Sequence, residues 1–284
     1  MLTFSNCKIN LGLFITDRRA DGFHNLASVF YPIEWNDAIE IELNPSSKAK
    51  IDLIEYGNSV TKNASENLCV KAYNLLDTKF NLPSIKLHLF KTIPTGAGLG
   101  GGSANASNTL KLLNSFFDLK ISIEELKNYA SQLGSDCAFF IDNTPAFVTR
   151  RGENIKPINL NLSHYSILLI KPAVHISTTD AFSKITSTPI DFDLEKAILL
   201  NPINEWKNFL RNDFEKGAIL NNPIIGEIKN AMYQWGALFA SMSGSGSSVF
   251  GIFDAYEKAE QVAKKYGDLK QKLIYSTLYL KNFI

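Results

Sequence analysis

The sequence predicts an α+β fold in two domains, and three observations lead to this prediction. A chain of 284 residues, 45% of them hydrophobic, is long enough for two modest hydrophobic cores. Segments with strand periodicity and segments with helix periodicity alternate irregularly along the chain. A polar stretch at 156–163 separates two apolar blocks. We therefore expect a first domain over residues 1–155 and a second over residues 156–284.

The first half of the chain contains strands on both sides of helical segments. Residues 8–15 alternate between apolar and polar positions, which places Lys8 and Asn10 on the face opposite four aliphatic side chains. By the same criteria we expect strands at 38–43, 50–55 and 85–89, and helices at 67–80, 104–117 and 122–133.

The second half continues the mixture. We expect strands at 146–149, 165–171, 239–246 (ending in a glycine turn), 248–253 and 273–280, and helices at 224–235 and 256–266. The stretch 178–212 is predicted to be helical with loops, because Pro and Asn are scattered through it.

Composition and charge exclude several classes of protein. The net charge of +1 argues against a nucleic-acid partner, which usually requires a concentrated basic surface. No apolar run is long enough to span a bilayer, and the first residues lack the pattern of a signal peptide. The three cysteines form no CxxC pair, which favours reduced thiols. We expect a soluble cytoplasmic protein with no membrane partner; the sequence leaves its oligomeric state open.

A glycine-rich segment between the strand at 85–89 and the helix at 104–117 predicts a phosphate-binding loop. Its residues are Pro94, Thr95, Gly96, Ala97, Gly98, Leu99, Gly100, Gly101, Gly102, Ser103 and Ala104. Glycines expose backbone N–H groups and permit positive φ, and the helix that follows offers unpaired N–H groups with a positive dipole end. The competing interpretations are a flexible connector or a helix with Ser103 as its N-cap.

Three familiar nucleotide-binding patterns do not fit this loop. A P-loop requires a Gly-Lys-Ser/Thr ending, and no lysine is present there. Gly96, Gly98 and Gly101 match the dinucleotide fingerprint, but the chain continues at 118–125 with a turn and a new helix instead of a second strand ending in an acidic residue. No HRD or DFG triplet of protein kinases occurs. The segment therefore predicts a phosphate site of another type.

Asp136 and Lys8 are the candidate catalytic residues. Asp136 lies between a glycine turn and an apolar block, where a carboxylate could accept a hydroxyl proton during phosphoryl transfer. The alternative is a helix N-cap, which that segment alone favours. Lys8 lies in an apolar strand and could pair with Asp136 and stabilise charge on a transferred phosphoryl group. Its alternative is a lysine whose ammonium reaches solvent from an edge strand.

Three segments together resemble the motifs of the GHMP family of small-molecule kinases. They are Lys8-Ile9-Asn10-Leu11, the loop from Pro94 to Ser103, and Ser243-Gly244-Ser245-Gly246, and the likeness runs from Asn6 to about Phe253. Arg19-Ala20-Asp21-Gly22-Phe23-His24-Asn25-Leu26 is more specific, because it resembles an RxDGYHxL segment of the members that phosphorylate a cytidylyl sugar alcohol. The resemblance implies a two-domain fold with the active site in the cleft between the domains.

The resemblance also implies roles for individual residues. Lys8 and Asp136 would be the catalytic pair, and the residues from Pro94 to Ala104 would hold ATP. Asn10 and Thr178 would lie beside the substrate, His24 would hydrogen-bond its cytosine, and Phe23 and Phe182 would cover the two faces of that ring. The segment Ser243–Ser247 would support the glycine loop.

The expected reaction is transfer of the γ-phosphate of ATP, with Mg²⁺, to the 2-hydroxyl of a cytidylyl sugar alcohol in non-mevalonate isoprenoid biosynthesis. The Mg²⁺ ligands are not evident, and Ser103 is a candidate. Phe23 replaces the usual tyrosine, so the resemblance implies no hydroxyl at this position. Two alternatives stay open: a GHMP kinase for mevalonate, homoserine or a sugar, and a non-catalytic nucleotide-binding protein of this fold.

Overall fold

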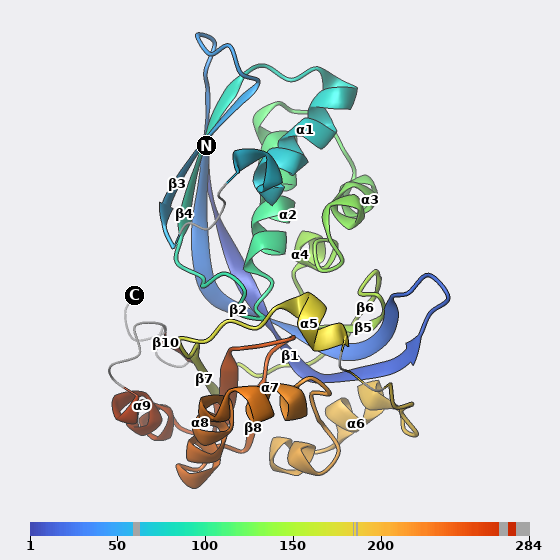
Figure 1. The fold of residues 1–284 in the computed structure, drawn as a ribbon. Helices are drawn as coiled ribbons and strands as arrows, with labels where there is room; N and C mark the ends of the chain where they lie inside the picture. The colour runs from blue at the N-terminus through green and yellow to red at the C-terminus, as the bar shows by residue number, and fades with distance from the viewer. Residues whose placement is uncertain (59–62, 184, 186, 267–271, 277–284) are drawn as a thin grey trace. The chain divides into compact units, whose positions relative to one another are not determined.

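The protein is an α+β structure, described here from a computed structural model that covers residues 1–58, 63–183, 185, 187–266 and 272–276 (Figure 1). Its strands are β1 (Leu2–Arg18), β2 (His24–Leu43), β3 (Ile51–Gly57), β4 (Ile85–Lys91), β5 (Ala146–Arg150), β6 (Asn154–Pro157), β7 (Ser166–Ile170), β8 (Phe239–Met242), β9 (Val249–Phe253) and β10 (Lys272–Ser276). Its α-helices are α1 (Leu68–Phe80), α2 (Gly101–Phe116), α3 (Ile123–Leu133), α4 (Phe139–Asp142), α5 (Thr178–Ser183), α6 (Leu194–Leu200), α7 (Glu215–Asn221), α8 (Pro223–Gln234) and α9 (Tyr256–Lys265). Two 3₁₀ segments are η1 (Ala64–Glu66) and η2 (Ile203–Asn208).

The chain divides into two compact units, each made of non-contiguous segments. Unit 1 comprises Met1–Lys8, Glu34–Thr95 and Gly100–Thr144, and unit 2 comprises Ile9–Ile33, Gly96–Leu99 and Pro145–Ile284. Strands β1 and β2 therefore contribute residues to both units. The domain boundary expected between residues 155 and 156 stays a prediction.

Unit 1 is built on strands β3, β4 and the second half of β2. Strand β4 runs antiparallel to β2, from Ala38 opposite Phe90 to Leu43 opposite Ile85, and parallel to β3. Helices α1 to α4 lie on one side of these strands in Figure 1. The core between the two layers contains buried residues of the strands and of α1 and α2, among them Leu87, Tyr73 and Leu110. This layer of helices over strands positions the amino end of α2, which follows the glycine loop.

Unit 2 contains the first half of β2 and a second sheet. The first half of β2 pairs antiparallel with β5, and β5 pairs antiparallel with β6. The second sheet has the order β10–β7–β9–β8 with antiparallel neighbours throughout. Helices α8 and α9 pack against it and bury Leu168, Ile228, Met232, Phe253 and Val262 in one core. The short turn between β8 and β9 contains the serine and glycine residues of the Ser243–Ser247 segment.

Most of the expected elements are confirmed, with a few corrections. Strand β1 is longer than the predicted 8–15, and residues 5–15 are buried on both faces, so the expected split into one buried and one polar face is wrong. Helix α2 begins at Gly101 instead of residue 104. Strand β6 and helix α7 were not predicted. Residues 272–276 form β10, and the rest of the strand expected at 273–280 lies outside the described residues.

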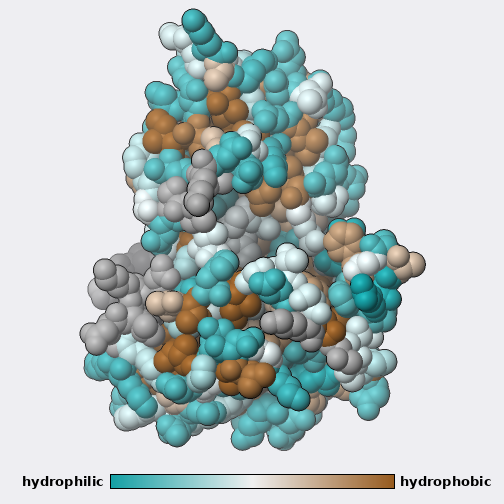
Figure 2. Space-filling view, in the orientation of Figure 1, coloured by the Kyte–Doolittle hydropathy of each residue, from teal (hydrophilic) through white to brown (hydrophobic). Residues whose placement is uncertain are grey.

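The molecular surface is polar on the face shown in Figure 2. Hydrophilic residues cover most of that face, and apolar residues gather in small patches between them. None of the helices in the described part of the chain combines the length and the apolarity that a bilayer crossing requires.

Candidate functional site

The amino end of α2 follows glycines with positive φ and has no side-chain cap. Gly96, Gly98 and Gly100 have φ values of 62°, 76° and 70°, a region that favours glycine over residues with a side chain. Gly100 is the N-cap of α2, and no side chain caps the helix. The competing interpretation of Ser103 as the helix N-cap is therefore wrong, because Ser103 lies within the first turn. First-turn N–H groups without a side-chain cap can hydrogen-bond an anion.

In unit 2, the middle of the glycine loop lies directly against the turn between β8 and β9. A Cβ atom on Gly98 would lie 2.0 Å from the carbonyl oxygen of Ser243, which leaves no room for a side chain. The Ser243 hydroxyl donates to the carbonyl oxygen of Gly98 at 2.8 Å, and the Ser248 N–H donates to that of Ala97 at 3.2 Å. The expected support of the loop by the Ser243–Ser247 segment is confirmed.

Asn212 holds that turn in place and was missed by the sequence analysis. Its amide nitrogen donates to the carbonyl oxygens of Met242 and Gly244, each at 2.8 Å, and its side chain is buried. The residue lies between η2 and α7, in a segment without a motif. Only the fold brings it to the turn that supports the glycine loop.

Asn10 belongs to the same buried polar group in unit 2. Its amide donates to the Ser28 hydroxyl at 3.0 Å, and its carbonyl oxygen lies 3.4 Å from the Ser243 hydroxyl. The residue is only 1% exposed. These contacts link β1 and β2 to the turn that supports the glycine loop. The expectation that Asn10 lies beside the substrate stays a prediction.

In unit 1, Lys8 and Asp136 form an ion pair. The Lys8 ammonium lies 3.4 Å from the Asp136 carboxylate, and the Lys8 residue is only 3% exposed. The alternative of a lysine that reaches solvent is therefore wrong. Asp136 lies in the turn between α3 and α4, and the N-cap of α4 is Ala138, with no side-chain hydrogen bond. The alternative in which Asp136 caps that helix is also wrong.

The ion pair lies beside the amino end of α2. A Cβ atom on Gly100 would lie 3.2 Å from Cε of Lys8, so the lysine stem packs against the helix N-cap. A Cβ atom on Gly134, two residues before Asp136, would lie 3.8 Å from the Ser103 hydroxyl. The ammonium and the helix dipole both present positive potential to an anion bound at this point.

Burial also determines the chemistry of the neighbouring thiol. Burial raises the pKa of Cys137 to about 11, although hydrogen bonds with Ser103 and Ser107 lower it in part. Cys137 therefore stays protonated at neutral pH and is not a nucleophile beside Asp136.

A pocket of about 200 Å³ opens in unit 1 next to the glycine loop. Thr95 and Gly102 of the predicted loop contribute to its wall, and so does Asn67, whose amide donates to the Glu55 carboxylate at 2.9 Å. The remaining lining residues are Glu55, Glu66, Leu68, Leu89, Lys91 and Asn105. No sequence pattern reveals this pocket, because its lining residues come from separate segments of the chain.

Three of the residues predicted to bind the substrate, His24, Phe182 and Thr178, lie in unit 2. His24 and Phe182 contact each other, and Thr178 contacts the turn between β8 and β9. The rings of His24 and Phe182 stack with centroids 5.4 Å apart and an interplanar angle of 29°. The rings of Phe182 and Phe214 also make an edge contact, with centroids 4.7 Å apart. The Thr178 hydroxyl lies 3.1 Å from the Ser245 hydroxyl, in the turn that supports the glycine loop.

Phe23 has a partner that was not predicted. The Arg151 guanidinium lies 3.9 Å from the centroid of the Phe23 ring, in a cation–π contact. Leu26 at the start of β2 pairs with Arg150 at the end of β5. This register brings Phe23, just before β2, close to Arg151, just after β5. Phe23 is 52% exposed, so its ring remains accessible to a ligand.

The described residues contain no group of three His, Cys, Asp or Glu side chains that could hold a metal ion. Mg²⁺ commonly binds through one or two carboxylates together with the phosphates of its nucleotide. Asp136 and the hydroxyl of Ser103 fit that donor set beside the amino end of α2.

Comparisons with known proteins agree with this geometry. The model of the GHMP kinases N terminal domain matches residues 67–150, and the model of the GHMP kinases C terminal domain matches residues 194–269. A Bacteroides thetaiotaomicron protein named 4-diphosphocytidyl-2-C-methyl-D-erythritol kinase is 51% identical over 254 residues, which cover 89% of this chain and 92% of the relative. A Parabacteroides distasonis protein of the same name is 45% identical, with 89% and 92% of the two chains covered.

Solved structures give the same result. The crystal structure of a 4-(cytidine 5'-diphospho)-2C-methyl-D-erythritol kinase matches with a TM-score of 0.80 and 26% identity, covering 96% of this chain and 98% of the other. The structure of a homoserine kinase from Cytophaga hutchinsonii matches with a TM-score of 0.71 over 96% of this chain and 93% of the other. At 17% identity, this second match shows a shared fold only.

Proposed function

This chain belongs to the GHMP kinase family, and from that premise we propose that it is an ATP-dependent kinase for 4-diphosphocytidyl-2-C-methyl-D-erythritol. It transfers the γ-phosphate of ATP to the 2-hydroxyl of the methylerythritol moiety, a step of non-mevalonate isoprenoid biosynthesis. The observation that carries the proposed chemistry is the ion pair of Lys8 with Asp136 beside the open amino end of α2.

Asp136 and Lys8 have complementary roles in the proposed reaction. Asp136 orients the substrate hydroxyl and accepts its proton, as a positioned carboxylate does in phosphoryl transfer. Lys8 holds the carboxylate through the ion pair and stabilises negative charge on the transferred phosphoryl group. Mg²⁺, when bound, neutralises the phosphates, and we propose the Ser103 hydroxyl and Asp136 as its nearest protein oxygens.

We propose that ATP occupies the region from Pro94 to Ala104. The backbone N–H groups at the start of α2 bind the phosphates, because they lack a side-chain cap and lie at the positive end of the helix dipole. The adjacent pocket of about 200 Å³ takes part of the nucleoside, since Thr95 and Gly102 are shared between the loop and the pocket wall.

We propose that Phe23, His24, Phe182 and Thr178 bind the cytidylyl part of the substrate. In support of this, the His24 and Phe182 rings already lie in a stacked arrangement with each other. Asn10 acts through the Ser243 contact on the glycine loop and lies beside the substrate. We also propose a cytoplasmic location, supported by three buried cysteines that form no CxxC pair.

A coupled ADP-release assay tests this function. We expect turnover with 4-diphosphocytidyl-2-C-methyl-D-erythritol and none above background with mevalonate or homoserine in parallel reactions. Turnover on mevalonate or homoserine alone would overturn the substrate assignment. ADP binding without turnover on any of the three substrates would favour a non-catalytic nucleotide-binding protein.

A further inference from the structure

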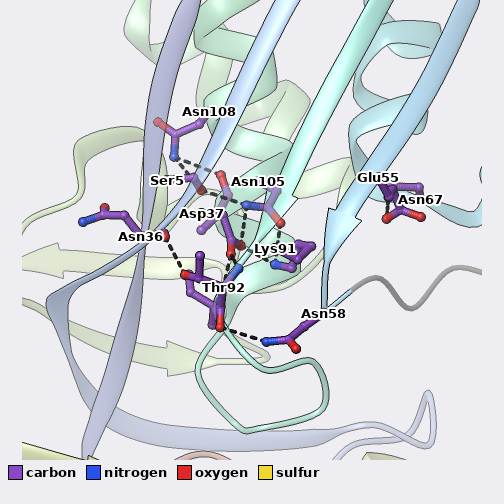
Figure 3. Close-up of polar contacts among 12 residues, drawn as sticks. Ser5, Asn36, Asp37, Glu55, Asn58, Asn67, Lys91, Thr92, Asn105 and Asn108 are labelled. Atoms are coloured by element: carbon purple, nitrogen blue, oxygen red, sulfur yellow. Dashed lines mark hydrogen bonds and ion pairs between the residues drawn. The ribbon is translucent and has the colours of Figure 1, made fainter. Parts of the chain in front are cut away.

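Asp37 is a fully buried carboxylate that joins three segments at the base of the glycine loop (Figure 3). Its Oδ1 atom accepts hydrogen bonds from the backbone N–H groups of Thr92 at 2.8 Å and Ile93 at 2.9 Å. Its Oδ2 atom accepts from the Asn105 amide at 2.9 Å and from the Lys91 ammonium. The carboxylate is thus surrounded by four donors, and no proposed reactant contacts it.

These four donors flank the two ends of the glycine loop. Lys91, Thr92 and Ile93 directly precede Pro94, whereas Asn105 lies in the second turn of α2. The Lys91 ammonium also donates to the side-chain Oδ1 of Asn105 at 2.8 Å, which closes the group. A single side chain of β2 therefore fixes the chain both before and after the loop.

The two ends of the loop are also packed closely together. A Cβ atom on Gly101 would lie 2.9 Å from Cγ2 of Ile93 and 3.5 Å from the Lys91 ammonium. The start of α2 therefore rests on the residues that Asp37 holds. A shift of Ile93 changes the position of Gly101, and with it the first-turn N–H groups proposed to bind phosphate.

Neighbouring residues hold Thr92 independently of Asp37. The Thr92 hydroxyl donates to the carbonyl oxygen of Asn36 at 2.6 Å, and the Asn58 amide donates to the carbonyl oxygen of Thr92 at 3.2 Å. Figure 3 shows these contacts on either side of Thr92. Loss of the Asp37 carboxylate is thus expected to release Ile93 and Asn105 while β4 stays attached at Thr92.

We propose that Asp37 is a positioning residue for ATP, which acts by fixing both ends of the glycine loop and the side chains of Lys91 and Asn105 in the pocket wall. This inference rests on the proposed ATP site. Asp37 itself is not part of the pocket wall and has no exposed surface, so its effect on nucleotide binding is indirect.

Asp37→Asn tests the proposal, because it keeps the size of the side chain but replaces one acceptor oxygen by a donor. We expect the KM for ATP and the Kd for ADP to rise about 10- to 100-fold. A loss of this size is typical when groups that position a ligand are displaced by a small distance. The KM for the cytidylyl substrate is expected to stay within about twofold of the wild-type value, because its proposed residues lie elsewhere. ADP binding is measured by calorimetry, so this readout does not depend on the identity of the second substrate.

Asp77→Asn is the matched control in the same unit. Asp77 also accepts from a lysine, Lys50 at 3.0 Å, and from a backbone N–H group, that of Leu82 at 2.7 Å, but it lies at the far end of α1 from the loop. Loss of this carboxylate is expected to lower the melting temperature without changing the KM for ATP. Equal nucleotide effects in both variants would overturn the proposal.

A second pair of variants decides the question if Asp37→Asn does not fold. Asn105→Ala removes the hydrogen bonds of the Asn105 side chain with Asp37 and Lys91 but leaves the ion pair between Lys91 and Asp37 in place. Asn108→Ala is its control, because Asn108 is also a buried residue of α2. The side-chain amides of Asn105 and Asn108 both donate to the Ser5 hydroxyl, but Asn108 has no contact with Asp37. A weaker affinity for ADP in Asn105→Ala alone supports the proposal.

The results separate this inference from the proposed function. A folded Asp37→Asn protein with wild-type affinity for ADP overturns the positioning role, whatever the second substrate is. Equal ADP affinities in the Asn105→Ala and Asn108→Ala proteins also overturn it. Failure of the wild-type protein to phosphorylate the cytidylyl substrate overturns the proposed function instead, while ADP affinity still tests Asp37.

Discussion

Asp136 is the residue on which the proposed chemistry depends, and its surroundings distinguish it from an ordinary surface carboxylate. It pairs with a lysine that has almost no exposed surface, next to the N-cap of the helix that follows the glycine loop. A buried ammonium is rarely found without a compensating charge, so the ion pair accounts for Lys8 within an otherwise apolar strand. The pair therefore favours a chemical role over a capping role.

Asp136→Asn is expected to lower kcat by about 10²- to 10⁴-fold, the usual contribution of a positioned acid or base. The Kd for ADP is expected to change little, because the backbone groups of the loop stay in place. Asp142→Asn is the matched control, since Asp142 also pairs with a lysine, Lys127 at 2.8 Å, and its side chain is 29% exposed, as that of Asp136 is. Similar kcat values in the two variants would return Asp136 to a structural role.

Phe182→Ala is expected to raise the KM for the cytidylyl substrate about 5- to 100-fold, because stacking on a base is worth about 1–3 kcal/mol. The KM for ATP is expected to stay unchanged. Phe192→Ala serves as the control, because Phe192 makes comparable edge contacts with Phe14 and Phe209 away from His24. If the steady-state KM for the cytidylyl substrate is the same in both variants, Phe182 does not bind the base.

Among the elements, the glycine loop shows why small residues are required there. Gly98 has a positive φ and lies against the Ser243 carbonyl, and Gly244 in turn lies against Gly98, since its own Cβ would be 2.9 Å from the Gly98 oxygen. The loop and the turn between β8 and β9 are thus complementary backbone surfaces. The Ser243 hydroxyl then joins them through a hydrogen bond.

Gly98→Ala is expected to raise the KM for ATP and lower kcat, together by about 10²-fold in kcat/KM, because the loop must move to accommodate the new Cβ. Gly217→Ala is the control: it lies in α7 with nothing within 4 Å of its Cβ position, and helical alanine is expected to add roughly 0.5–1 kcal/mol of stability. Steady-state kinetics and thermal melting check both variants. Wild-type kinetics in Gly98→Ala would show that the loop is not held as tightly as its contacts indicate.

The elements that sequence patterns predicted best have strong local signals. Helix α3 was expected from residue 122, and Ser122 is its N-cap, in a capping box with Glu125. Helix α2 was placed three residues late, because Gly101 and Gly102 have low helix propensity. The structure includes them because Gly101 packs against Ile93, a tertiary contact that outweighs propensity.

Across the whole molecule, the motifs predicted the candidate site but not the groups that support it. The glycine loop and the pair of Lys8 with Asp136 could be inferred from the sequence, since each residue type is unusual in its local setting. Asp37 could not, because its partners lie 54 to 68 positions away and a single acidic residue just before the predicted strand at 38–43 has no local signal. Asn212 was missed for the same reason.

The thiols provide a test of the fold as a whole, because their burial depends on packing in several segments. All three cysteines are buried, and burial raises the pKa of Cys7 and Cys69 to about 12 and that of Cys137 to about 11. A raised thiol pKa keeps the protonated form, so at pH 8 the reactive thiolate is reduced by about two orders of magnitude for Cys137 and by about three for Cys7 and Cys69, relative to an exposed cysteine. With a disulfide-exchange reagent such as Ellman's reagent, we expect no rapid reaction of thiols in the native protein. In denaturant, we expect all three thiols to react, which releases three equivalents of the coloured product.

The Cys137→Ser variant provides the control, because the number of thiols that react in denaturant should fall to two. Rapid release of one equivalent from the native protein that is lost in this variant would mean that the turn containing Asp136 opens readily, which is incompatible with a carboxylate held in place for catalysis.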